Sequence, residues 1–189
     1  MSMPPRNSAA GRIKLGWDEF LELPEDGNRY EILDGELVMT PPPAIRHQRI
    51  SSRLHMLLGA YVAARELGEV LAAPVAVRLS ESTIVEPDLL FLATGRSKIV
   101  SDLSIDGPPD LVVEILSPST AKRDRTVKAQ LYARLGVRHY WIVDPETRTV
   151  DVFELHGKRY RKKATLEEND RFEPTILPGL IVDLSTVWA

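Results

Sequence analysis

The sequence predicts an α/β fold with a mixed sheet flanked by helices and with added antiparallel hairpins, and three observations support this fold class. The order strand, helix, strand over residues 111–144 predicts a parallel βαβ unit with a right-handed crossover. Antiparallel hairpins are predicted before and after that unit. The 189 residues are 43% hydrophobic and 27% charged, as expected for one globular domain with a sizeable core.

The first half of the chain alternates short elements with one long helix. A short helix is predicted at 17–23, followed by two strands over 29–41 around Asp34-Gly35, a dipeptide that favours a tight hairpin turn. After the prolines at 41–43, apolar residues recur at helical spacing up to a stop signal at Gly68. Residues 69–80 and 86–93 indicate strands.

The second half begins with an apolar strand at 111–117. A turn at "SPST" leads into a helix over 121–135 closed by Gly136, and a second buried strand follows at 138–144. A hairpin is predicted around His156-Gly157, and the last stretch is apolar enough to dock against the domain. We expect residues 1–14 to be a mobile tail and 15–189 a single domain.

Composition excludes several classes of protein. There is no cysteine, which excludes disulfides, thiolate zinc sites and cysteine nucleophiles and is compatible with a cytoplasmic location. No stretch approaches the roughly 18 consecutive apolar residues of a membrane helix, and the N-terminus lacks the apolar region of a secretory signal. H-E-x-x-H, Walker and Rossmann glycine motifs are also absent.

Charge is distributed unevenly along the chain. The net charge is −3, yet residues 122–163 hold 12 of the 24 Lys and Arg and only 5 of the 27 Asp and Glu. Such asymmetry can create a positive face on an acidic protein. The nucleic-acid-binding candidates are Lys122, Arg123, Arg125, Lys158, Arg159 and Arg161. The alternative is a helix and a hairpin whose basic faces are simply solvated.

Glu114 interrupts the apolar strand 111–117. Burying an ionised carboxylate costs several kcal/mol unless a cation meets it, so a metal ion or a buried base would explain it. Two Pro-Asp pairs offer a second acid. Asp110 lies four residues away on the same strand, about 13 Å at about 3.3 Å per residue, which is too far to share a metal. We therefore expect Asp110 to be structural and Asp88, on a different strand, to lie beside Glu114.

Two adjacent carboxylates favour a divalent cation. At about 4 Å they would repel by about 4 kcal/mol, and hard oxygen ligands select Mg²⁺ or Mn²⁺ over zinc. Either acid could instead be structural. Apolar residues recur on one face of the helix predicted over 121–135, and Lys128 lies at the start of that face. Lys128 should therefore face the sheet and these carboxylates. The alternative is an i,i+4 pair with Asp124 at the edge of the helix.

The motifs "EPDLLFLA" and "PDLVVEILSPSTAKRDRTVKAQLYARLGVRHYWIVDPETRTVDVFEL" resemble the Uma-type family of bacterial restriction-endonuclease-like proteins, within the PD-(D/E)xK nuclease superfamily. "RYEILDGELVMTPPPAIRHQRI" looks like the N-terminal motif of that family. The resemblance implies a Mg²⁺- or Mn²⁺-dependent DNA endonuclease, with Asp88 at the Pro-Asp position and Glu114 at the second acidic position. The superfamily lysine would fall at Leu116, and the resemblance makes Lys128 its substitute.

Secondary candidates surround these three catalytic candidates. His47 lies on the inward stripe of the long helix, where it either touches the active site or is a hydrogen-bonded core histidine; Glu31 and Asp124 are similar candidates. We expect DNA as the partner, a homodimer or higher homo-oligomer, and no membrane association. The alternatives are a catalytically inactive nuclease-fold protein that binds nucleic acid or a protein partner, and an oligomeric interaction protein with a buried Glu114–Lys128 ion pair.

Overall fold

A computed structural model describes residues 14–188 of the chain, so the predicted tail lies, except for Lys14, outside the described residues. Its centre is a six-stranded sheet in the order β10-β9-β8-β7-β6-β3. Every neighbouring pair is antiparallel except β7 and β8, which are parallel, as the βαβ prediction required. The strands are β3 Gly68–Ala72, β6 Leu89–Ala93, β7 Leu111–Ile115, β8 His139–Asp144, β9 Thr149–His156 and β10 Arg159–Leu166.

A smaller sheet, in the order β2-β1-β5-β4, packs on one side of the first. Its strands are β1 Arg29–Leu33, β2 Glu36–Thr40, β4 Val77–Ser80 and β5 Thr83–Val85; β11 Arg171–Phe172 and β12 Val182–Asp183 form a separate pair. The helices are α1 Trp17–Leu21, α2 Ile45–Ala64, α3 Ala121–Arg123, α4 Ala129–Leu135 and α5 Ser185–Trp188, with a short 3₁₀ turn (η1) at Ser97–Ile99. The predicted mixed α/β fold with added hairpins is confirmed.

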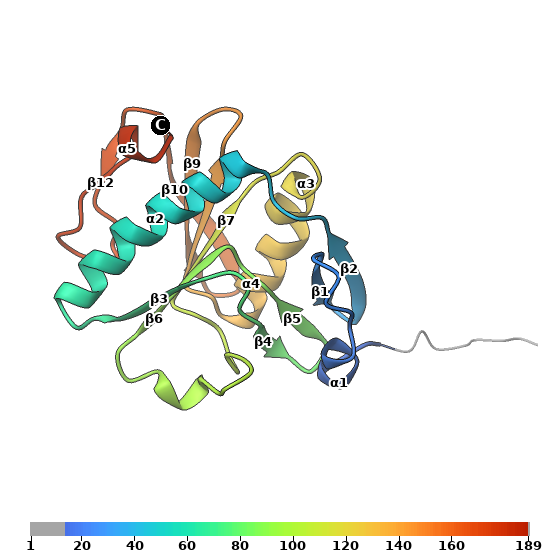
Figure 1. Cartoon of the computed structure of the whole chain (residues 1–189). Helices are drawn as coiled ribbons and strands as arrows, with labels where there is room; N and C mark the ends of the chain where they lie inside the picture. Colours follow the sequence, from blue (N-terminus) through green and yellow to red (C-terminus); the bar gives the residue numbers. More distant parts are fainter. Residues whose placement is uncertain (1–13, 189) are drawn as a thin grey trace, which may run out of the picture.

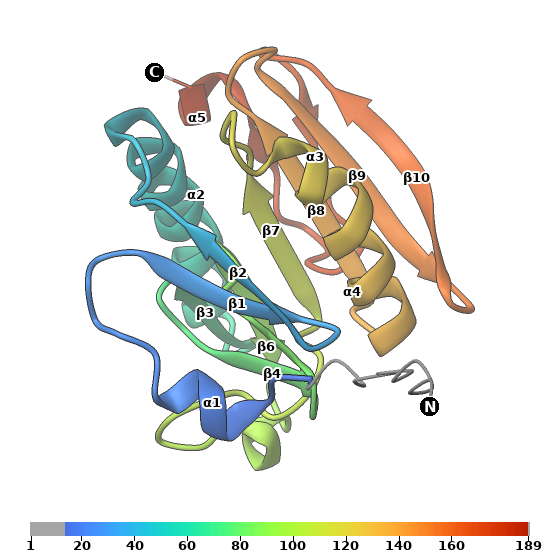
Figure 2. The ribbon, with the colours of Figure 1, turned by 90° about the vertical axis from the view of Figure 1, so that its right-hand side faces the viewer.

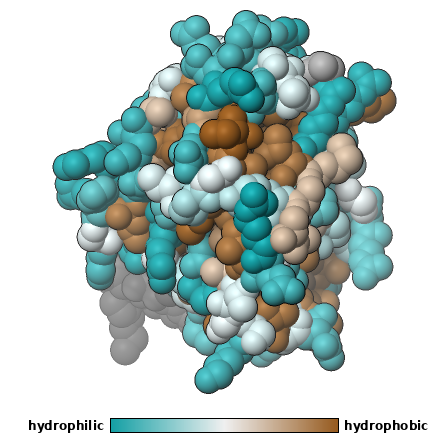
Figure 3. Space-filling view, turned by 90° about the vertical axis from the view of Figure 1, so that its left-hand side faces the viewer, coloured by the Kyte–Doolittle hydropathy of each residue, from teal (hydrophilic) through white to brown (hydrophobic). Residues whose placement is uncertain are grey.

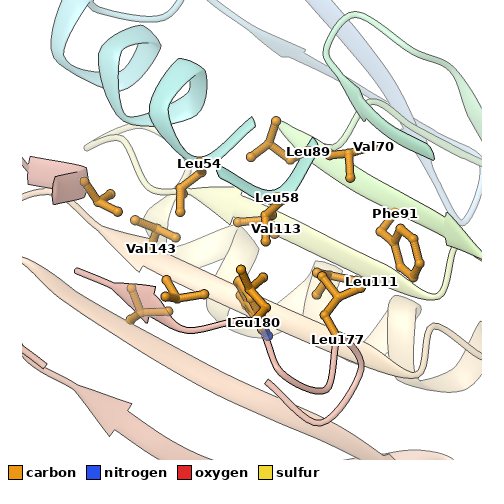
Figure 4. Packing of buried hydrophobic residues seen from close by; sticks show 14 of the residues in the cluster. Leu54, Leu58, Val70, Leu89, Phe91, Leu111, Val113, Val143, Leu177 and Leu180 are labelled. Carbon is orange, nitrogen blue, oxygen red and sulfur yellow. The ribbon is translucent and has the colours of Figure 1, made fainter. Parts of the chain in front are cut away.

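Two hydrophobic clusters cover the two faces of the large sheet. Figures 1 and 2 show α2 and α4 on opposite sides of β7. On the first face, Leu54 and Leu58 of α2 point toward Val113, and the C-terminal residues Leu177 and Leu180 complete the cluster, as Figure 4 shows. The predicted docking of the C-terminal stretch is therefore confirmed.

The second face is covered by α4 and the small sheet. Alternate residues of the central strands, such as Leu90 and Val112, pack there against Tyr132 of α4 and Val85 of β5. All five residues of β7 are buried, because both of its faces are covered and it has a strand on each side. Glu114 is thus placed in the interior of the molecule.

Three local predictions needed correction. The helix predicted to run to Gly68 ends at Ala64; Gly68 instead starts β3 at φ 140°, where a Cβ would lie 1.9 Å from the Leu92 carbonyl oxygen. The stretch 69–80 divides at the cis Ala73–Pro74 bond into strands of two different sheets. The helix 121–135 contains one π-helical turn, Asp124–Lys128 (η2), between α3 and α4.

The described surface is mostly polar. Figure 3 shows one face on which hydrophobic side chains gather in the middle of a largely hydrophilic surround. Across residues 14–188, no helix has both the length and the apolar character needed to cross a bilayer.

Candidate active site

Asp88 and Glu114 lie at the same end of two central strands. β6 and β7 are antiparallel with Leu89 opposite Val113, so Asp88, one residue before Leu89, and Glu114, one residue after Val113, come close together. Asp88 also accepts the amide of Ile115, the residue next to Glu114, and both acids line one cavity. Both residues are buried, at 4% and 3% exposure. The sequence expectation that a neighbouring strand would bring Asp88 beside Glu114 is met by this register.

Both carboxylate oxygens of Asp88 are held. Oδ1 accepts a hydrogen bond from Arg29 at 2.6 Å, and Oδ2 lies 2.7 Å from the Ile115 amide nitrogen and 3.1 Å from Nε2 of His47. Burial alone would raise the pKa of Asp88, but the hydrogen bond to His47 and the charge of Arg29 outweigh it and lower this pKa to about 2. Asp88 is therefore ionised at any working pH.

Glu114 is held through one oxygen only. Its Oε1 lies 2.6 Å from Nζ of Lys128 and accepts a 2.6 Å hydrogen bond from the Tyr132 hydroxyl. Burial raises the pKa of Glu114 to about 8; Lys128 opposes this shift and the nearby carboxylates reinforce it. The second oxygen, Oε2, has no contact of this kind among the described residues, so it is available to a further ligand.

Lys128 lies among three carboxylates. Its Nζ is 2.6 Å from Glu114 and 2.8 Å from Oε1 of Glu31 on β1, and Asp124 is 3.9 Å away. Burial would lower the pKa of Lys128, but these three acids outweigh it and raise that pKa. One ammonium group thus faces three carboxylates, a local formal charge of about −2 when all are ionised.

The π turn helps to place Lys128. The helix is π-helical over Asp124–Lys128; Asp124 and Lys128 are buried there, while Arg125 and Val127 are exposed. Such π turns occur frequently at functional sites. The Tyr140 hydroxyl bonds to the Asp124 carbonyl oxygen at 3.0 Å and so ties this turn to β8.

A cavity of about 220 Å³ opens at this cluster. It is lined by the four carboxylates, by Lys128, Arg29 and His47, by the prolines 41–43, and by the "SPST" turn with Arg123. Figure 2 shows the C-terminal end of β7, where the site lies, between α2 and α3. The strand end, the helix N-terminus and the proline segment therefore converge on one concave site, the usual setting of a catalytic centre.

The structure brings together all six predicted catalytic and secondary residues. They are Asp88, Glu114, Lys128, His47, Glu31 and Asp124. The alternative i,i+4 pair of Lys128 with Asp124 is present at 3.9 Å, but Lys128 is 3% exposed and lies closer to Glu114, at 2.6 Å. His47 is a buried, hydrogen-bonded histidine, and its partner is Asp88 of the candidate site.

Asp110 lies at the other end of the same strands. Its Oδ2 accepts the Ala93 amide at 2.9 Å, and Oδ1 pairs with Arg96 at 3.3 Å. It does not line the cavity. Asp110 therefore joins the start of β7 to the end of β6, as a structural residue would.

The predicted basic residues are divided between two places. Arg123 lines the cavity and donates to Thr40 at 2.7 Å, with exposed Lys122 beside it, while Arg125 is paired with Asp144 and Asp151. The exposed residues Lys158, Arg159 and Arg161 lie at the β9–β10 turn. The strand registers place that turn beside the start of β7, at the opposite end of the sheet from Glu114 (Figure 2). The two basic segments therefore do not form one surface around the site.

Sequence reasoning missed three residues of the site. Arg29 holds Asp88 and also bonds the Glu86 carbonyl oxygen; Glu86 in turn donates its amide to Glu31 at 3.1 Å. Arg29 lies two residues before Glu31 on β1, so strand alternation already placed both on one face. Tyr132 lies on the apolar side of the helix, yet its hydroxyl donates a hydrogen bond to Glu114 at 2.6 Å.

The donor set fits a hard divalent cation. Within residues 14–188, three or more His, Asp or Glu side chains are nowhere grouped in a geometry ready for a metal ion. Two carboxylates do line the same cavity, Asp88 ionised and Glu114 with one oxygen that has no partner among residues 14–188, in a cluster with a surplus of acidic over basic groups. Mg²⁺ is commonly bound through only one or two carboxylates, with waters and phosphate oxygens completing its coordination.

The fold and this cluster define a nuclease-like α/β protein. A solved structure from Anabaena variabilis, described as a "putative nuclease belonging to DUF820", has the same fold: the TM-score is 0.75 over 92% of this chain and 97% of that one, at 21% identity. The chain belongs to the Uma2 family, described as "Putative restriction endonuclease", whose model matches residues 17–185. No curated protein matches the sequence.

Proposed function

We propose that this protein is a divalent-metal-dependent endonuclease that hydrolyses phosphodiester bonds of DNA. The observation that supports it most is the arrangement of Asp88 beside Glu114 with the Lys128 ammonium 2.6 Å from Glu114, inside a cavity open to the surface. Membership of the Uma2 family supports the same reaction class. The chemistry is attack of water on phosphorus, with cleavage of one P–O ester bond.

Asp88 and Glu114 would hold Mg²⁺ or Mn²⁺, and the ion would supply positive charge to stabilise the phosphodiester in the transition state. Arg29, the Ile115 amide and His47 fix the orientation of the Asp88 carboxylate. Tyr132 does the same for Glu114. Because Glu114 has its pKa raised to about 8, it must release its proton when it becomes a ligand.

Lys128 would orient the attacking water and stabilise charge on the phosphate. Its ammonium has three donor hydrogens, and two of them are directed to Glu114 and Glu31 at 2.6 and 2.8 Å. The remaining donor is available to a water or a phosphate oxygen. Lys128 thereby serves in place of a lysine at position 116, where the sequence has buried Leu116.

The test is cleavage of supercoiled plasmid, linear duplex and single-stranded DNA with Mg²⁺, Mn²⁺ or EDTA. We expect cleavage only with metal, and none by Glu114→Gln, whose fold should be intact. Asp110→Asn is the matched control and should remain active.

Absence of cleavage by the wild type, with Mn²⁺ binding intact and DNA bound, would favour the inactive nuclease-fold binding protein. Absence of both metal and DNA binding would favour an interaction protein built around the Glu114–Lys128 ion pair. Assembly as a homodimer or higher homo-oligomer stays a prediction, which sedimentation velocity would check.

A further inference from the structure

A second, larger cavity of about 800 Å³ adjoins the candidate active site. Four residues line both cavities, namely Arg29, Pro43, His47 and Asp88. The larger cavity lies between α2, the segment 20–30 and the Ala73-Pro74 turn. A molecule with one part at Asp88 can therefore extend into it without leaving the protein surface.

The wall supplied by α2 is polar although it faces inward. One side of α2 packs in the core through Ile50, Leu54 and Leu58. A neighbouring side carries His47, Ser51 and His55 at four-residue spacing, and all three line the larger cavity. The helix thus turns hydrogen-bonding side chains toward a space inside the molecule.

Part of this polar wall has no partner. Ser51 is 7% exposed, and its hydroxyl makes no hydrogen bond to another described residue. Nδ1 of His47 is buried and likewise lacks a partner within residues 14–188. Gln48 adds an exposed amide that can both donate and accept. The hydroxyl of Ser51 and the amide of Gln48 can therefore hydrogen-bond to a molecule in this cavity.

Part of the rest of the wall is apolar. That apolar part is formed by the side chains of Phe20, Leu21, Leu23, Pro24, Pro43 and Pro74, and polar side chains, among them Asn28, Tyr30 and Glu86, complete the lining. Flat apolar surfaces combined with a few donors and acceptors are what a planar heteroaromatic ring requires. A nucleobase has that combination, and it would be covalently joined to the phosphate held at Asp88 and Glu114.

We propose that this cavity, the base cavity, binds one unstacked nucleobase next to the phosphodiester that is cleaved. The inference rests on the proposed function and specifies its substrate as nucleic acid with an unpaired nucleotide. Extrusion of a base from a duplex costs unstacking and unpairing energy, which is least in single-stranded or damaged DNA. The protein should therefore prefer single strands or distorted sites over regular duplex.

The experiment compares two single strands of about ten units that carry the same phosphates, one with bases and one fully abasic. Binding of fluorescein-labelled strands is measured by anisotropy with Ca²⁺ in place of Mg²⁺ or Mn²⁺, so that a divalent cation is present while cleavage is suppressed. We expect the strand with bases to bind about tenfold more tightly, since base contacts of this kind commonly contribute such factors. Gln48→Ala and Ser51→Leu should remove most of that difference and leave binding of the abasic strand unchanged.

Gln130→Ala, at an exposed position of α4 that lines neither cavity, is the matched control and should bind as the wild type does. If Ser51→Leu does not fold, Gln48→Ala decides alone, because Gln48 is exposed. Equal binding of the two strands would overturn the base cavity while leaving nucleic-acid binding in place. A base preference that survives both variants would overturn its location. Binding of neither strand would overturn the base cavity and count against the proposed function as well.

Discussion

Asp88 and Asp110 are both buried aspartates that follow a proline, and they lie at opposite ends of the β6–β7 pair. Asp110 is satisfied by the Ala93 amide and one arginine, Arg96, so that one negative charge meets one positive charge. Asp88 is also held by an arginine, but it adjoins Glu114, whose own cation serves three carboxylates. The same sequence pattern therefore gives a balanced site at one end and an unbalanced site at the other.

This difference indicates which buried acid is structural and which is functional. A balanced buried pair needs nothing further, and removal of one partner simply costs stability. In an unbalanced cluster, the buried carboxylates lower the stability of the folded protein. The pKa of Glu114, which is raised to about 8 chiefly by burial, shows that its ionised form is disfavoured there. Strongly perturbed titrating groups in a cleft are candidates for function for this reason.

The largest expected effect is a difference in DNA cleavage between variants of Asp88 and Asp110. Asp88→Asn should reduce DNA cleavage by a factor of about 10⁴, typical for loss of one member of a catalytic unit, because a metal ligand is lost. Asp110→Asn should stay within about threefold of the wild type and lose about 1–2 kcal/mol of stability instead. Cleavage rates with Mn²⁺ and urea denaturation measure the two effects. Equal losses of activity in the two folded variants would contradict the comparison.

The next effect is a difference in stability between variants of the two cationic residues, Lys128 and Arg96. Lys128→Met should lower the free energy of unfolding by about 3–5 kcal/mol at neutral pH, because Glu31 and Asp124 then lack a cation and the Glu114 carboxyl group loses its contact with Lys128. The loss should shrink in acid, where those carboxylates are protonated. Arg96→Met should cost only about 1 kcal/mol, since the Arg96 side chain is 28% exposed. Similar losses for both variants would show that the surplus of carboxylates around Lys128 does not affect the free energy of unfolding.

Most of the fold could be predicted from local patterns. The Asp34-Gly35 turn, the αL Gly136 cap and the buried strands 111–115 and 139–144 each follow from short stretches of sequence. The exchange between sheets at Ala73-Pro74 could not be predicted, because a continuous β-rich stretch does not specify which sheet each half joins. The π turn at Asp124–Lys128 was equally hidden, since tertiary contacts, not propensity, select it.

Those site residues could be predicted whose residue type and spacing in the sequence already indicate where they lie. An acid inside an apolar strand identified Glu114, and the helix stripe placed Lys128. Arg29 and Tyr132 escaped notice because their roles depend on which side chain faces them across the fold. The wrong grouping of the two basic segments has the same origin: local charge is visible in sequence, but the end of the sheet at which each segment lies is set by strand direction.

A smaller effect concerns pH. The folded-state pKa of Glu114 is raised to about 8 from an ordinary 4.5, so the folded protein holds a proton that the unfolded chain has released over that window. Stability should be full below about pH 4.5 and fall by on the order of 2–4 kcal/mol as pH rises through 8. Glu114→Gln should flatten this slope, be more stable than the wild type near pH 8, and bind no Mn²⁺. Urea denaturation across pH 4.5–8.5 tests it; a parallel slope in the variant would remove Glu114 as its source.

The smallest effect is expected for the basic turn at the balanced end. Lys158, Arg159 and Arg161 are exposed, and the registers place them about the length of β9 from Glu114, so a phosphate bound at the site does not meet them. Replacing all three by alanine should change DNA affinity by less than about twofold at moderate salt, with a nearly unchanged salt slope. Arg123 lines the cavity and Lys122 precedes it. Replacing both by alanine should reduce the salt slope by about one to two, which corresponds to the loss of one or two phosphate contacts. Binding isotherms between low and high salt give both slopes. The opposite result would be a large effect of the turn variant and no effect of the Lys122 and Arg123 variant. It would place the DNA at the other end of the sheet, away from Asp88 and Glu114, and would contradict DNA cleavage at that site.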